Sequence, residues 1–164
     1  MSRNRTIPDA QVFAAILHLI ATDGEKAVAF SAVARATGLA APSLVQRYGS
    51  LQDMFGAAMR SEWDRLDAQA DNAIAQVQAE GKGVTSLLKA LAPASAALLA
   101  ASARDATLRE RAARWRARVE AGLSRRPDGQ DTAAMLFAVW QGQCLWAATG
   151  DKDFKLKDAV KRLG

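Results

Sequence analysis

The segment that decides the fold is AFSAVARATGLAAPSLVQRYGSLQDMF, residues 29–55. It predicts two short helices, over residues 31–37 and 41–48, and the start of a third helix at residue 50. Gly38 and Gly49 end the short helices, because glycine readily adopts the left-handed conformation that commonly closes a helix. Ser50 and Asp53 have capping-box spacing, which marks the start of the next helix.

The two short helices have the pattern of a helix-turn-helix, in which one helix supports another that enters the major groove of DNA. Leu39, Leu44 and Tyr48 are expected to anchor the pair to a preceding helix. The second helix is then expected to turn five side chains outward: Ala41, Ser43, Val45, Gln46 and Arg47. Gln46 matches an adenine edge or another base edge, Arg47 a guanine or a phosphate, and Val45 or Ala41 a thymine methyl group.

Outside this segment, the spacing of apolar residues predicts further helices and no strand. The expected ranges are residues 8–23, 50–80, 84–103, 106–123, 132–149 and 155–163. A bend is expected at Pro93, because proline interrupts the hydrogen bonding of a helix. The expected fold is therefore all-α, with an N-terminal three-helix head over residues 1–55 and a C-terminal helical domain over residues 56–164.

Residues 12–55 resemble the N-terminal head of the TetR family of transcriptional regulators. The matching positions are Asp23 and Gly24, Val33 and Ala34, Ala36, Gly38 and Leu39, Leu44, the aromatic Tyr48, Ser50, and the apolar pair at 54–55. The resemblance is close over about a quarter of the chain, and the remainder agrees only in being helical and of roughly suitable length.

The resemblance implies a homodimer whose two heads bind a palindromic operator in double-stranded DNA. It also implies that the C-terminal domain binds a small molecule that releases the DNA. Repression is the commoner mode in the family, and the sequence leaves activation open. The expected DNA-binding residues are Ser31, Arg35, Ala41, Pro42, Ser43, Val45, Gln46, Arg47, Tyr48 and Ser50.

The head departs from the family pattern at positions that often contact phosphate. Val45 replaces a usual aromatic residue, Leu51 replaces a usual lysine, and Ala41 replaces a lysine or polar residue. Residues 1–60 hold six Lys/Arg and four Asp/Glu, a net charge of only +2. Arg3 and Arg5 are candidates for a minor groove or for neighbouring phosphates. We therefore expect operator binding to depend on salt less than it does for a lysine-rich head.

All four tryptophans lie in the C-terminal part of the chain. Such side chains fill a core, line a ligand pocket or anchor an interface. A pocket is expected between helix 132–149 and the helices at 57–103, for a small apolar or aromatic effector. Its expected lining is Trp63, Leu87, Leu91, Leu98, Trp115, Trp140 and Gln141.

Helix 132–149 is apolar almost all round, so several of its sides must be buried. It is expected to form an intersubunit four-helix bundle with the last helix or with helix 106–123. The expected interface residues are Met135, Phe137, Trp140 and Cys144.

Residues 104–126 hold eight arginines against three acids, a net charge of +5. The simplest interpretation is a solvated helix face. An acidic effector, an acidic partner, or an intersubunit bridge to Glu110 or Glu120 stays open, and an anionic effector would suit this segment.

Other classes of function lack the residues they need. A single histidine and a single cysteine make a metal centre, a Ser/His/Asp set or an internal disulfide untenable. Neither an enzyme nor a cofactor is therefore expected. No apolar run reaches the roughly 18 residues of a membrane span, and no signal peptide is recognised, so a cytoplasmic location without a membrane is expected. The alternative function is a helical ligand-binding or dimerisation protein without operator binding.

Overall fold

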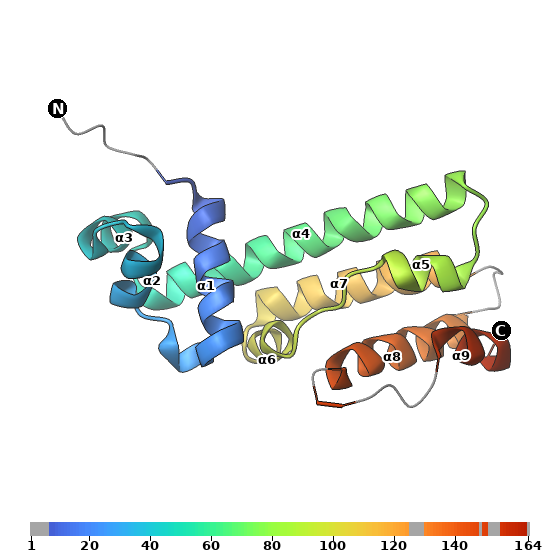
Figure 1. The fold of residues 1–164 in the computed structure, drawn as a ribbon. Helices are drawn as coiled ribbons and strands as arrows, with labels where there is room; N and C mark the ends of the chain where they lie inside the picture. Colours follow the sequence, from blue (N-terminus) through green and yellow to red (C-terminus); the bar gives the residue numbers. More distant parts are fainter. Residues whose placement is uncertain (1–6, 125–129, 148, 151–154, 164) are drawn as a thin grey trace. The chain divides into compact units, whose positions relative to one another are not determined.

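The computed structural model describes residues 7–124, 130–147, 149–150 and 155–163 (Figure 1). Over these residues it contains α-helices, one 3-10 turn and no strand, which confirms the all-α class. The elements are α1 (Asp9–Asp23), η1 (Glu25–Ala27), α2 (Phe30–Thr37), α3 (Ala41–Tyr48), α4 (Leu51–Ala79), α5 (Val84–Ala90), α6 (Ala96–Arg104), α7 (Ala106–Leu123), α8 (Gln130–Trp146) and α9 (Leu156–Leu163).

The chain divides into two compact units, Met1–Glu62 and Trp63–Gly164. The division falls inside α4, the longest helix, so this helix contributes residues to both units. The sequence placed a domain boundary at residue 55, close to the start of α4, and the functional division into a head and a ligand-binding domain stays a prediction.

The first unit is built on apolar residues that α1, α2 and α3 turn toward one another. Val12, Ile16, Val33 and Leu44 have no exposed surface. α2 contacts both α1 and α3. Gly38 closes α2 at φ 75°, in the left-handed region, and its N–H donates to the carbonyl of Ala34 at 2.8 Å. The two short helices and the glycine turn that the sequence predicts between them are therefore present.

Ser50 begins α4 as expected. Its Oγ accepts a hydrogen bond from the Asp53 backbone N–H at 3.0 Å and donates to the Asp53 carboxylate at 2.6 Å. The hydroxyl therefore satisfies one of the unpaired N–H groups at the start of a long helix.

The expected helix 84–103 is two helices, α5 and α6, separated by residues 91–95. Pro93 lacks an N–H and disfavours helical backbone at the residue before it, so the expected bend is a complete break. Side chains from other helices bind the backbone that leaves the helix here: Ala92 N–H donates to Gln69 Oε1 at 3.0 Å, and Ala94 N–H donates to Gln141 Oε1 at 3.1 Å. Ser95 then caps α6 by accepting from Leu98 N–H at 3.2 Å.

The second unit has an aromatic core. The rings of Trp63 and Trp115 are 5.5 Å apart, those of Trp115 and Phe137 5.7 Å, and those of Trp115 and Trp140 6.3 Å, measured between centroids. α7 contacts α6 and α8, and α8 also contacts α9. Trp115 of α7 is thus at the centre of the packing.

Candidate nucleic-acid interface and aromatic core

The outward face of α3 carries small, apolar and amide side chains. Ser43, Val45 and Gln46 are exposed, and Val45 keeps 44% of its surface accessible. Leu44 is fully buried between them, which fixes the rotation of the helix about its axis. Pro42 is exposed and Ala41 is half-buried at the start of the same helix.

A hollow of about 260 Å³ lies on this face, lined by Leu39, Ser43, Gln46 and Arg47. Leu39 is half-buried, so it supplies an apolar floor, while the hydroxyl of Ser43 and the amide of Gln46 supply hydrogen-bonding groups. A base edge that carries both a methyl group and a hydrogen-bond donor or acceptor therefore matches the apolar and polar groups of this hollow.

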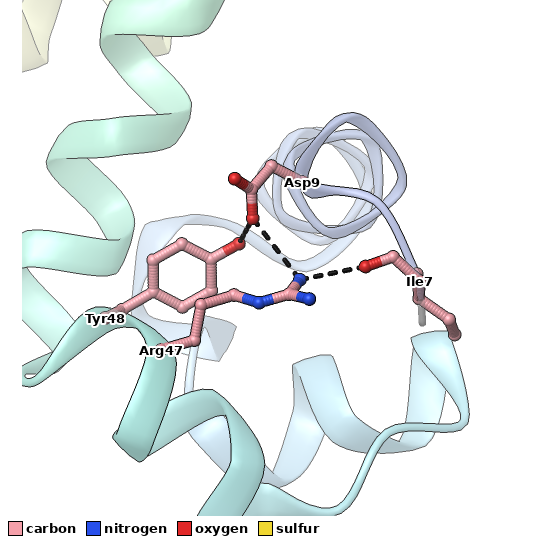
Figure 2. Close-up of polar contacts among 4 residues, drawn as sticks. All are labelled: Ile7, Asp9, Arg47 and Tyr48. Carbon is pink, nitrogen blue, oxygen red and sulfur yellow. Dashed lines mark hydrogen bonds and ion pairs between the residues drawn. The ribbon is translucent and has the colours of Figure 1, made fainter. Parts of the chain in front are cut away.

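Arg47 is also exposed, but its guanidinium is engaged at the start of α1. Figure 2 shows its guanidinium directed at the start of α1, where Nη1 donates to the Ile7 carbonyl at 2.9 Å and to Asp9 Oδ1 at 3.3 Å. The hydroxyl of Tyr48 donates to the same carboxylate oxygen of Asp9. We call these four residues, Ile7, Asp9, Arg47 and Tyr48, the α1–α3 clasp.

The clasp also sets the chemistry of Tyr48. Its ring packs beside Phe13 at 6.0 Å between centroids and lies 5.9 Å from the Arg47 guanidinium carbon. Burial and the hydrogen bond to Asp9 raise the pKa of Tyr48 to about 12. The phenol is therefore a neutral donor at physiological pH, with its hydrogen already committed to Asp9.

Sequence reasoning does not find the clasp. The spacing of Asp9 from Thr6 predicts a capping box instead, and Thr6 lies outside the described residues, as do Arg3 and Arg5. The acidic side chain in the first turn of α1 was the available signal, but a partner 38 residues away in the chain leaves no spacing pattern.

The remaining predicted DNA-binding residues lie beside α3. Ser31 and Arg35 are exposed on α2. Ser50 is exposed at the start of α4, although its hydroxyl is engaged with Asp53. Leu51, at the start of the same helix, is 40% exposed. These residues are thus exposed on α2 and at the start of α4, the elements that precede and follow α3 in the chain, and whether they contact DNA stays a prediction.

All seven residues predicted to line an effector pocket are buried. They are Trp63, Leu87, Leu91, Leu98, Trp115, Trp140 and Gln141. The three indole rings pack closely, so a ligand reaches them only if the side chains move apart. Gln141 stabilises the chain itself, because both ends of its amide bond the Ala94 backbone, with Nε2 donating to the carbonyl at 2.8 Å.

The two central tryptophans differ in the pairing of their N–H groups. Trp63 Nε1 donates to Ser102 Oγ at 3.1 Å. Trp115 Nε1 is buried and has no hydrogen-bond partner among the described residues, although the side chain is only 1% exposed. A buried unpaired donor costs about 1–3 kcal/mol, so this N–H is an attractive position for an acceptor atom.

The residues predicted for a dimer interface divide into two groups. Phe137 and Trp140 are covered by their own chain, because they pack on Trp115. Met135 is 45% exposed and Cys144 is half-buried. The apolar surface that α8 leaves uncovered also includes Leu145 and Trp146, which sequence reasoning did not select; Trp146 is 73% exposed.

Arg111, Arg116 and Arg118 of α7 pair with acids of the same chain. Arg111 bonds Asp64 and, two turns further along both helices, Arg118 bonds Asp71 at 2.5 Å. The Asp71 carboxylate raises the pKa of the Arg118 guanidinium above its usual value. Arg116 bonds Glu120 at 2.6 Å, so this acid has a partner within the subunit.

The described residues contain no helix that is long and apolar enough to cross a membrane. Among the same residues, no group of three or more His, Cys, Asp or Glu side chains is arranged to hold a metal ion.

Comparisons with known proteins identify the fold. No protein-family model and no curated protein sequence matches the chain. Among solved structures, SCO7518, a candidate transcriptional regulator from Streptomyces coelicolor A3(2), superposes with a TM-score of 0.66 at 22% identity over 94% of each chain.

The multidrug binding protein EbrR is a second structural neighbour. Its complex with malachite green superposes with a TM-score of 0.68 at 22% identity, covering 98% of this chain and 96% of that chain. Its complex with imidazole gives a TM-score of 0.65 at 21% identity, covering 94% and 92%. The chain therefore shares its all-α fold with these proteins over nearly its whole length.

Proposed function

We propose that this protein is a homodimeric transcriptional regulator of the TetR type, which binds a palindromic operator and is released from it by a small molecule. The observation that carries the proposal is the exposed face of α3, a helix held between glycine turns with Ser43, Val45 and Gln46 directed outward. The fold shared with SCO7518, itself a candidate regulator, supports the same function.

The face of α3 suits a major groove in size and chemistry. An α-helix with its side chains is about 10–12 Å across, similar to the roughly 12 Å width of the major groove. The face has hydrogen-bonding and apolar side chains but no carboxylate among the residues of α3. It therefore carries groups that distinguish base edges without repelling the phosphates on either side.

A homodimer is supported by the uncovered side of α8. Met135, Leu145 and Trp146 are large apolar side chains exposed to solvent, which is costly unless a partner covers them. A second copy presents the same residues, and a symmetric contact buries both sets at once. Two heads held in this way match the two half-sites of a palindrome.

The aromatic core of the second unit supports binding of an apolar or aromatic effector. The rings of Trp63, Phe137 and Trp140 each pack against Trp115 there, and the unpaired Trp115 N–H favours an effector that also has an acceptor atom. EbrR, which has the same fold, was crystallised with malachite green, a large aromatic compound. Because the rings are closed over, effector binding is expected to move α7 or α8 and so to alter the spacing of the heads. Because the proposed effector releases the protein from DNA, the protein occupies its operator in the absence of the effector, and we therefore propose that it acts as a repressor.

The test combines a gel shift with a search for the effector. Full-length protein is incubated at low salt with DNA flanking its own gene, and malachite green, anionic aromatics and neutral aromatics are then added. Specific binding that one of these compounds abolishes supports the proposal. The absence of specific binding at every neighbouring promoter, together with a ligand-induced rise in melting temperature, favours a ligand-binding or dimerisation protein without an operator.

A further inference from the structure

The single basic side chain of α3 is committed to the α1–α3 clasp. Arg47 donates through Nη1 to a backbone carbonyl and to Asp9, and Asp9 is itself fixed by Tyr48. An arginine reads guanine through two parallel N–H bonds to O6 and N7. The clasp occupies Nη1 and holds the guanidinium at the start of α1, so the pair formed by Nη1 and Nη2 reaches a base only when Arg47 leaves the clasp. While Arg47 stays there, its Nε and Nη2 donors suit phosphate, which carries no sequence information.

The side chains that α3 does expose match an A·T base pair. The Gln46 amide forms two hydrogen bonds with the N6 and N7 groups of adenine. Val45 and the Leu39 floor of the hollow offer apolar surface to the methyl group of thymine, which cytosine lacks.

We propose that Asp9 withholds Arg47 from the bases and thereby restricts α3 to A·T-rich half-sites. Asp9 is thus a positioning residue that determines specificity without touching DNA. This inference rests on the proposed operator binding, and it adds the class of base sequence that the head selects.

The test is selection from a random double-stranded DNA library with the full-length wild-type protein and with Asp9→Ala. The wild-type protein is expected to select A·T pairs beneath α3. The variant is expected to gain a guanine at one position of each half-site, preferred by about 5- to 150-fold, because Arg47 becomes available to the bases. Asp23→Ala is the matched control: it removes the same charge from the far end of α1 and is expected to keep the wild-type motif.

A second measurement needs no variant. Deoxyuridine in place of the selected thymines removes only methyl groups and is expected to weaken wild-type binding by about fourfold for each buried methyl. Replacing any guanine of the motif by 7-deazaguanine, which lacks the N7 acceptor, is expected to leave the affinity unchanged.

The possible failures are distinguishable. A wild-type motif with a required guanine that 7-deazaguanine weakens overturns the inference, and so does an Asp9→Ala motif identical to the wild-type motif in a variant that melts as a folded helical protein. Enrichment of no sequence by the wild-type protein overturns the proposed operator binding itself.

Discussion

The two central tryptophans offer a matched pair of substitutions. Trp63→Phe and Trp115→Phe remove the same atoms from two buried side chains in one core, so the losses of packing are alike to a first approximation. The N–H groups differ, because Trp63 has Ser102 as a partner and Trp115 has none among the described residues.

The expected magnitudes follow from that difference. Trp63→Phe also loses a hydrogen bond with a net value of about 0.5–1.5 kcal/mol. Ser102 keeps a second bond, since its Oγ donates to the Leu98 carbonyl at 2.8 Å. Trp115→Phe instead removes a donor that was buried without a partner and recovers about 1–3 kcal/mol. We therefore expect Trp63→Phe to lower the free energy of unfolding by about 1.5–4.5 kcal/mol more than Trp115→Phe does.

The assay is urea unfolding of both variants, followed by helical circular dichroism at one protein concentration, because a dimer's stability depends on concentration. Equal losses of stability in the two variants would refute the reasoning about Trp115. In the presence of an effector this difference in stability between the two variants is expected to narrow. An acceptor atom at the Trp115 N–H stabilises Trp63→Phe, which keeps that N–H, and does not stabilise Trp115→Phe.

Three further predictions concern the dimer, the turn and the charge of the head. Trp146→Glu is expected to give monomers in gel filtration with light scattering, whereas Ala75→Glu at an exposed site on α4 is expected to leave the dimer intact; a dimeric Trp146→Glu protein would contradict the proposed face. Gly38→Ala is expected to lower the free energy of unfolding by about 1–2 kcal/mol, because its φ of 75° is strained for any residue with a Cβ, and an unchanged urea midpoint would be inconsistent with this. The logarithm of operator affinity against the logarithm of salt concentration is expected to show release of fewer than about eight counterions, and a steeper slope would contradict the weakly charged head.

The sequence predicted most of the helices because their signals are local. Glycine turns at Gly38 and Gly49, a capping serine at Ser50 and apolar residues one turn apart specify a helix and its ends within a few residues. The range 84–103, predicted as one bent helix, shows what these local signals do not predict. Pro93 indicated an interruption, but the separation of α5 from α6 depends on Gln69 and Gln141, whose amides replace the lost helical hydrogen bonds from elsewhere in the chain.

The sites were less predictable because they depend on which face of a helix is covered. α8 is apolar on most sides, so its periodicity did not separate the inward residues Phe137 and Trp140 from the outward Trp146. Arg47 was expected to face outward from its position in α3, and its engagement with Asp9 depends on where two exposed side chains meet in space. Polar contacts between residues far apart in the chain leave no periodic pattern in the sequence, so the sequence does not predict them.

The distribution of charge makes dimerisation essential to the proposed function. Arg111 and Arg118 are paired with Asp64 and Asp71, so these members of the arginine-rich segment are not an additional cationic surface for DNA. A head with a net charge of +2 and a clasped Arg47 gains little from phosphates, and one head alone is expected to bind weakly. Linking two heads raises the effective concentration of the second at its half-site, which can increase overall affinity by about 10²–10⁴. A monomeric Trp146→Glu protein with a folded head should therefore lose operator binding almost completely instead of losing half of it.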